Sequence, residues 1–189
     1  REDGRPSPSG PDQYLGTAQP DFLAGWNNTI RYGNYTLGFQ IDGRFGGQFY
    51  SNTSANLDSY GVGARTLQYR ESGVTLDGLN TATNTDNTTS ITGQEYWGTT
   101  STIAENYIYD QDNIRLRELS IGYQIPNTVD YGIQSASIQL IGRNLFFFSK
   151  EAPDVDPENM LGTAIGAQGF NSNNLPSLRS LGLNLTLNF

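Results

Sequence analysis

The side chains best suited to chemistry in this sequence are carboxylates, because the chain has 0 histidines and 0 cysteines. Thiolate and imidazole metal sites, disulfides and every Ser-His or Cys-His catalytic arrangement are therefore excluded. Asp110 and Asp112 are spaced like the start of a calcium-binding EF-hand loop. Arg115 stands where that loop needs its glycine, and no glutamate follows at the required position.

A second acidic group, Asp154, Asp156 and Glu158, offers oxygen ligands of the kind that Ca²⁺ prefers. Nothing in the surrounding sequence fixes their geometry. We therefore predict no metal site, no cofactor and no enzymatic activity. The balance of 11 basic against 19 acidic residues gives a net charge of -8, which argues against nucleic acid as a partner.

Aromatic side chains offer a third kind of chemistry, the capture of a ligand or of another protein. They lie in a polar stretch, 46–112, that is rich in threonine, asparagine and serine. Flat rings with amide and hydroxyl neighbours suit a sugar or a peptide, but the same rings could simply hold the stretch together. The candidates are Tyr60, Tyr69, Tyr96, Trp97, Tyr107 and Tyr109.

Alternating apolar residues predict the strands that position these groups. Along 181–189 every second residue is leucine or phenylalanine, and the residues between are small or polar. A strand of about ten residues with this period suits a tilted transmembrane β-strand. A half-buried strand of a soluble sandwich has the same period. The expected strands cover about 22–32, 35–46, 113–125, 135–145 and 178–189.

The connections between these strands alternate in length. Short links are expected at Gly33-Asn34 and 127–134, whereas the connections 46–112 and 146–176 are long. Outer-membrane barrels have short periplasmic turns and long extracellular loops. The composition favours strands and polar loops over helices, so we expect an antiparallel, all-β barrel segment whose long loops, with the leader 1–21, are extracellular.

Charged residues fall on the polar side of these strands. A charge that faced lipid would cost about 2 to 4 kcal/mol at the middle of a bilayer, so we expect these side chains to face the barrel lumen or a plug within it. Known membrane barrels begin at about eight strands, so five strands would need further strands to close. The lumen candidates are Arg31, Asp42, Arg44, Glu118 and Arg143.

One stretch, Arg115–Tyr123 (RLRELSIGY), resembles the "RLRELSLGY" signature of the SusC/RagA family of TonB-linked outer-membrane proteins. Three further matches follow the order of that family. They are 41–47 (IDGRFGG), 142–146 (GRNLF) and the terminal alternating strand that ends in Phe189. The acidic segment 154–158 also resembles the family's "DPE" segment.

The resemblance implies the last five strands of a plugged, 22-strand TonB-dependent barrel in the outer membrane of a Bacteroidetes-type bacterium. Such barrels import glycan oligosaccharides or peptides, driven by the TonB system through the plug, and a SusD-like surface lipoprotein forms their lid. The partners expected for this chain are thus the rest of the barrel, its plug, the lipoprotein and membrane lipid. Phe189 would belong to a signal for barrel assembly.

One alternative comes from a different class, a secreted and soluble β-sandwich module that binds carbohydrate. The two hypotheses differ in what covers the apolar face of the strands. A sandwich packs that face against a second sheet, whereas a membrane barrel turns it towards lipid.

Overall fold

The computed structural model describes residues 3–126, 132–164 and 166–189. The chain divides into two compact units. The sheet unit comprises Gln19–Gly47, Asp110–Glu158 and Pro176–Phe189. The loop unit comprises Arg1–Ala18, Gln48–Tyr109 and Asn159–Leu175.

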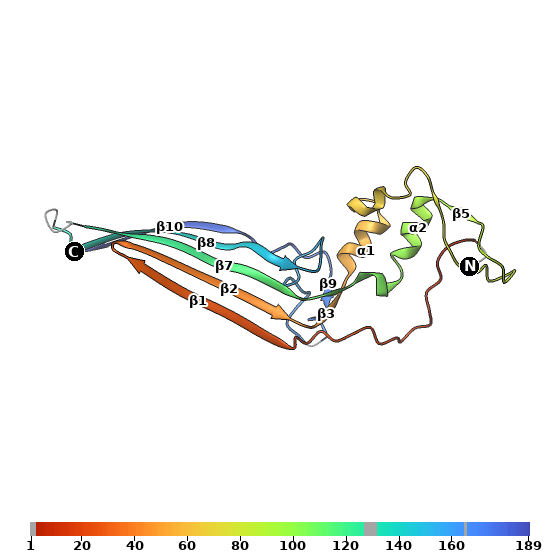
Figure 1. Cartoon of the computed structure of the whole chain (residues 1–189), viewed down its shortest axis with the longest axis horizontal. Helices are drawn as coiled ribbons and strands as arrows, with labels where there is room; N and C mark the ends of the chain where they lie inside the picture. The colour runs from red at the N-terminus through yellow and green to blue at the C-terminus, as the bar shows by residue number, and fades with distance from the viewer. Residues whose placement is uncertain (1–2, 127–131, 165) are drawn as a thin grey trace. The chain divides into compact units, whose positions relative to one another are not determined.

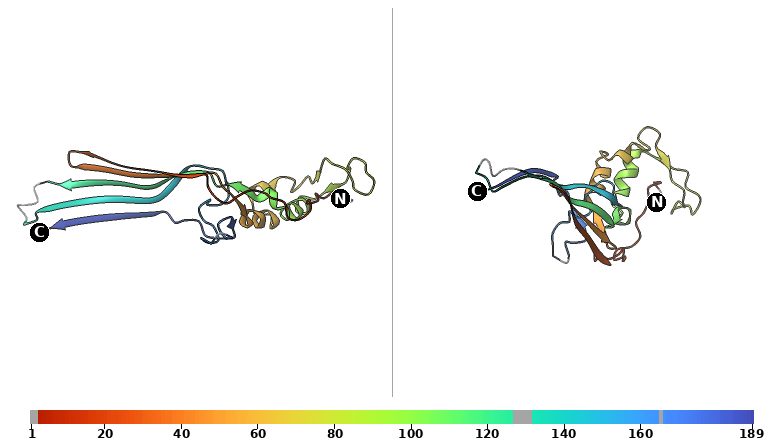
Figure 2. Two further views of the ribbon diagram at one scale, coloured as in Figure 1. Left: turned by 90° about the horizontal axis from the view of Figure 1, so that it is seen from below. Right: turned by 60° about the vertical axis from the view of Figure 1, so that its left-hand side comes forward.

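Five antiparallel strands form the sheet unit, side by side in the order β1-β2-β7-β8-β10 (Figures 1 and 2). The five strands thus occur in the sheet in the same order as in the sequence, with the shorter strands of the loop unit between some of them along the chain. The edge strands β1 and β10 each pair with one strand among the described residues, so the sheet is open rather than a closed barrel. The bounds are β1 Phe22–Tyr32, β2 Tyr35–Phe45, β7 Asn113–Ile125, β8 Ser135–Lys150 and β10 Ser180–Asn188.

The register separates an apolar face from a polar face. One row across all five strands is apolar, and the next row is polar or glycine. Leu183, in the apolar row, is 69% exposed, and no second sheet covers this face within the described part of the chain. The apolar row is Ile30, Leu37, Ile121, Leu140 and Leu183, and the polar row is Arg31, Thr36, Gly122, Gln139 and Asn184.

The turn between β1 and β2 follows from the glycine at its first position. Gly33 adopts φ +57°, and Tyr32 pairs with Tyr35 across the turn. A positive φ at the first central residue is what a type II′ hairpin requires. The other short link, expected at 127–134, lies outside the described residues over 127–131.

The stretch 146–148, expected to begin a loop, instead continues β8 as far as Lys150. The ladder extends because Asn113, the first residue of β7, pairs with Lys150. Aromatic residues favour strand conformation, so this extension is consistent with the local sequence.

The loop unit contains helices, although the composition favours strands and polar loops over helices. In Figure 1 the helices α1 and α2 stand out in this part of the chain. No helix among the described residues has the length and hydropathy needed to span a membrane. The helices are α1 Asn52–Ser59 and α2 Gly93–Thr100, with 3-10 helices η1 Ala64–Leu67 and η2 Ala104–Tyr107. The short strands are β3 Gln48–Ser51, β4 Val74–Thr75, β5 Ser90–Ile91, β6 Ile108–Asp110 and β9 Phe170–Asn171.

Side-chain caps explain why such short helices form here. The Ser51 hydroxyl accepts from the Ser54 amide at 3.1 Å, which caps α1. Thr92 and Glu95 form a capping box at the start of α2. Hydrogen bonds from the Thr92 backbone and from Arg5 lower the pKa of Glu95 to about 2. These caps satisfy amide groups that the first turn leaves without partners.

A buried polar cluster lies at the centre of the loop unit. Tyr107 is 0% exposed, and its hydroxyl donates to the Asp58 carboxylate at 2.7 Å. Arg65 Nε donates to the same carboxylate at 2.9 Å, and its guanidinium lies 5.2 Å from the centre of the Tyr107 ring. Burial and the hydrogen bond to Asp58 raise the pKa of Tyr107. Asp58 thus joins α1 to the segments that carry η1 and η2.

Replacing Asp58 with Asn should therefore loosen the loop unit. The variant leaves the buried Tyr107 hydroxyl and Arg65 without their charged partner. We therefore expect the free energy of unfolding of the loop unit to fall by about 2 kcal/mol. Faster limited proteolysis within 48–109 would report the loss. Asp77→Asn, at an exposed position, is the matched control. Equal cleavage of both variants would contradict a central role for Asp58.

Candidate functional site

A β-bulge in β7 changes which of its residues lie on the polar face of the sheet. Gln40 of β2 pairs with Glu118, but the next residue, Ile41, pairs with Leu116. Arg117 is therefore an extra residue in the ladder. The bulge places Arg115 opposite Asp42. Arg115, before the bulge, and Glu118, after it, therefore lie on the same polar face of the sheet.

A matching irregularity occurs in β8. Glu118 pairs with Arg143 and Leu116 with Phe146, so Asn144 and Leu145 have no partner in this ladder. Asn144 adopts φ +51°, a left-handed conformation in which asparagine is enriched. Its side-chain oxygen accepts from Arg117 Nη1 at 3.1 Å. The two bulges together thus bring Asn144 to the guanidinium of Arg117.

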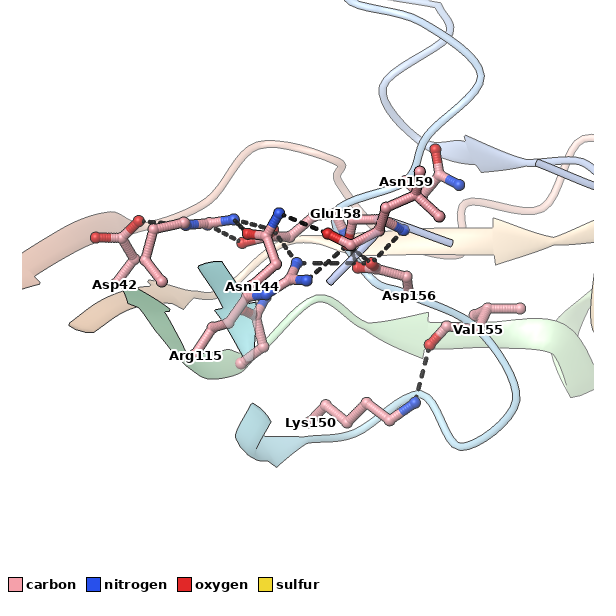
Figure 3. Close-up of polar contacts among 12 residues, drawn as sticks. Asp42, Arg115, Asn144, Lys150, Val155, Asp156, Glu158 and Asn159 are labelled. Carbon is pink, nitrogen blue, oxygen red and sulfur yellow. Dashed lines mark hydrogen bonds and ion pairs between the residues drawn. The ribbon is translucent and has the colours of Figure 1, made fainter. Parts of the chain in front are cut away.

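The arginines of β7 bind carboxylates from β2 and from the segment after β8. Arg117 Nε donates to Asp42 at 2.7 Å, and its Nη2 donates to Glu158 at 2.6 Å. Arg115 Nη1 donates to Glu158 at 2.7 Å. The Glu158 carboxylate therefore bridges both arginines, and Figure 3 shows it near Arg115.

Asp156 forms hydrogen bonds within the segment that follows β8 and with Ser177. Its carboxylate accepts from the Glu158 amide at 3.0 Å and from the amide and hydroxyl of Ser177, the amide at 3.1 Å. Arg115, whose side chain is 3% exposed, donates to the Ser177 hydroxyl at 2.7 Å and lies 3.6 Å from Asp156. Burial alone would raise the pKa of Asp156, but the hydrogen bonds from Ser177 and the Glu158 amide, with the charge of Arg115, lower it.

Two further contacts attach the same segment to β8. Lys150 Nζ donates to the carbonyl oxygens of Pro153 and Val155, each at 3.1 Å. Between the strands themselves, the guanidinium of Arg115 in β7 lies 4.5 Å from the centre of the Phe147 ring in β8, in a cation–π arrangement. We call residues 151–158, held in this way on the sheet unit, the docked segment.

The chemistry of this cluster is ion pairing. Asp156 and Glu158, considered as calcium ligands on sequence grounds, both direct their oxygens at Arg115. Within residues 3–126, 132–164 and 166–189, no group of three or more acidic side chains could hold a metal ion. The cluster therefore positions a connection of the chain.

Two of the residues expected to face a lumen form an ion pair and a third joins the cluster. Arg143 Nε donates to Glu118 at 2.9 Å, and Asp42 binds Arg117. Arg44 pairs with Asn113 in the ladder, and Arg31 lies on the edge strand β1. Their orientation towards a lumen stays a prediction.

Simple alternation missed Arg115 and Arg117, because their odd numbers match the apolar residues Leu119 and Ile121. A sequence signal was nevertheless present. Two arginines on a lipid-facing side would cost about 2 to 4 kcal/mol each. The strand therefore needs an irregularity before Glu118 that turns both arginines to the polar face.

The aromatic candidates divide by exposure. Trp97 and Tyr107 are buried, so their rings pack inside the loop unit. Tyr69 and Tyr96 are half-buried and meet edge to face at 5.2 Å. Tyr60 is 79% exposed, and it is the most accessible of the six candidates. The half-buried Tyr109 and the exposed Phe189 complete the predicted set.

Solved structures share this fold. The chain is similar to the RagAB peptide importer in its 'closed-closed' state, with a TM-score of 0.62, 18% sequence identity and 93% of this chain covered. The 'open-open' state gives a TM-score of 0.59 and 91% coverage. The matches cover 18% and 17% of those chains. At this identity the likeness concerns the fold, a mostly β structure with antiparallel sheets.

Two curated relatives are TonB-dependent receptors. TonB-dependent receptor P3 of Formosa agariphila is 29% identical over 175 residues, which cover 89% of this chain and 15% of the receptor. TonB-dependent receptor P26 of the same organism is 29% identical over 183 residues, or 93% of this chain and 18% of the receptor. No protein-family model matches the chain. The resemblance to TonB-linked outer-membrane proteins is thereby confirmed, for a chain that spans less than a fifth of these relatives.

The pKa of Asp156 predicts how the docked segment responds to pH. A lowered pKa in the folded state means that the carboxylate stabilises docking at neutral pH, and that this contribution disappears as the pH falls through the lowered value, below the ordinary 3.8. Asp156→Asn should release the segment at neutral pH. Loss of its charged hydrogen bonds should speed amide hydrogen exchange of 151–158 about tenfold or more.

Asp154→Asn is the control for this experiment, because Asp154 is exposed and lies two positions away. It should exchange like the parent protein at every pH. Unchanged exchange in Asp156→Asn would show that Asp156 does not hold the segment.

Proposed function

We propose that this chain is the C-terminal part of a TonB-dependent outer-membrane importer of nutrients, either glycan oligosaccharides or peptides, and that it has no enzymatic role. The observation that carries the proposal is the sheet, which has an uncovered apolar face on one side and a charged face on the other. Curated relatives that are TonB-dependent receptors support it.

In this proposal the five strands are the last of a 22-strand barrel. The edge strands β1 and β10 would pair with other strands of the same barrel, because an unpaired edge within a bilayer leaves backbone groups unsatisfied. Phe189, which directly follows β10, would serve as part of the assembly signal.

The polar face would line the lumen and contact the plug, through which the TonB system acts. Arg31, Asp42, Arg44, Glu118 and Arg143 lie on this face by sequence parity, and the bulge adds Arg115 and Arg117. The docked segment, bound to Arg115, would then lie towards the inside of the barrel rim.

The loop unit would be extracellular and would contact a SusD-like lipoprotein or the substrate. Support comes from the length of the connections, since long segments between elements are uncommon unless they are functional or disordered. The similar RagAB structures are those of a peptide importer, which supports a role of this unit in import. The β-sandwich alternative is not favoured, because no second sheet covers the apolar face of the described strands.

A pair of neighbouring substitutions tests the membrane assignment. Leu183→Arg would place a charge in lipid and should cost about 2 to 4 kcal/mol of barrel stability, whereas Asn184→Arg on the polar face should cost much less. Heat-modifiable migration of the intact polypeptide from outer-membrane fractions measures the folded barrel. Equal losses for both variants would contradict the assignment of faces.

A deletion tests the role of the loop unit. Replacing the stretch between Leu57 and Tyr107 with a short Gly-Ser link should reduce lipoprotein association or uptake, because it removes the exposed surface of this unit. Barrel assembly should persist, since the ladder of the sheet unit does not include these residues. Co-purification of the lipoprotein and nutrient uptake are the readouts. Normal complexes together with normal uptake would leave the stretch without a role in either.

A further inference from the structure

A pocket of about 410 Å³ lies in the loop unit beside α1 and α2. Ligand pockets in proteins typically have volumes of about 300 to 1,000 Å³, so this one has room for one or two sugar rings. Hydroxyl and amide side chains make up much of its wall. The lining includes Asp58, Ser59, Tyr60, Arg70, Gln94 and Trp97.

Arg70 supplies a fixed positive charge to this pocket. Its Nη2 donates to the Gly61 carbonyl at 2.7 Å and to the Thr66 hydroxyl at 3.3 Å. Both partners are neutral, so the charge of Arg70 is not cancelled by them. The guanidinium has five N–H donors, so its Nε and Nη1 groups can still donate a charge-assisted hydrogen bond to a carboxylate.

Asp58 is the other charged residue of the lining, and its charge is already compensated. Arg65 Nη2 lies 2.5 Å from its carboxylate, and the Tyr107 hydroxyl donates to it at 2.7 Å. The positive charge of Arg70 therefore remains uncompensated in the lining, although the chain as a whole has a net charge of -8. An anion would be attracted here, whereas a free amino group would find no available carboxylate in this lining.

The remaining wall fits a hydroxyl-rich ligand. The Tyr60 side chain is exposed, so its ring is free to pack on the apolar face of a sugar. Trp97 is fixed in place because its indole N–H donates to the Gln68 carbonyl at 3.1 Å. The hydroxyl of Ser59 and the amide of Gln94 offer neutral hydrogen-bonding groups.

We propose that this pocket binds an acidic oligosaccharide, with a uronate carboxylate on Arg70 and a sugar ring against Tyr60. The inference rests on the proposed importer function and narrows its substrate class. Peptides are disfavoured because a short peptide with a free amino group would lack an acidic partner in the lining.

Calorimetric titration of the intact polypeptide in detergent tests the proposal. The probes are trimers of galacturonate and of mannuronate, with trimers of galactose and of mannose as neutral counterparts. A tripeptide with a free carboxyl terminus and its amidated form complete the set. We expect a uronate trimer to bind about tenfold or more tightly than its neutral counterpart, as one charged hydrogen-bonded contact implies.

Variants assign the binding to the pocket. Arg70→Gln should weaken uronate binding about tenfold or more, and Arg70→Lys should weaken it less because the charge remains. Tyr60→Ala should weaken binding of acidic and neutral sugars alike. Arg179→Gln, which removes the same charge from an exposed position outside the pocket, is the matched control and should bind normally.

Three results would overturn the proposal: binding of no probe, equal binding of acidic and neutral sugars, or Arg70-dependent binding of the free-carboxyl peptide alone. The failure of the importer function would look different. In that case the polypeptide would be absent from the outer-membrane fraction, whatever its affinity for uronates.

Discussion

The exclusion of charge from the apolar face of the sheet is the constraint on which the sheet unit depends. Arg115 and Arg117 lie in the same strand as Leu119 and Ile121, at positions of the same parity. A regular strand would carry both arginines to the apolar side. The bulge at Arg117 moves them to the polar face, and only there do they meet Asp42 and Glu158.

One local irregularity in the backbone therefore has several structural effects. It gives Glu158 two cationic partners, and it requires β8 to bulge at Asn144 so that the ladder can continue on both sides. It also creates the place where Asp156 is buried beside Arg115, with Ser177 as a hydrogen-bond partner of both. The cost of burying the Asp156 carboxylate is offset by the charge of Arg115 and by hydrogen bonds from Ser177 and the Glu158 amide.

Much of the sheet could be predicted from the sequence, because strict alternation with a turn at Gly33 leaves few other structures. The helices of the loop unit could not be predicted from composition, since α1 contains Asn, Thr and Ser, which rank low in helix propensity. The pattern from Thr92 to Glu95 was the usable signal for α2, because it spells a capping box. The ion cluster was missed since Arg115 and Asp156 are far apart in the chain. The pocket beside Arg70 depends on helices that the sequence did not predict.

The docked segment divides the connection between β8 and β10 into parts with different freedom to change. Residues 151–158 are attached to the sheet unit through Lys150, Arg115 and Arg117, whereas Asn159–Leu175 belongs to the loop unit. Insertions are tolerated where few backbone contacts depend on local length. Related proteins should therefore differ in length within 159–175 while keeping the spacing from Lys150 to Glu158 constant. The sheet unit and the loop unit would then diversify at separate rates.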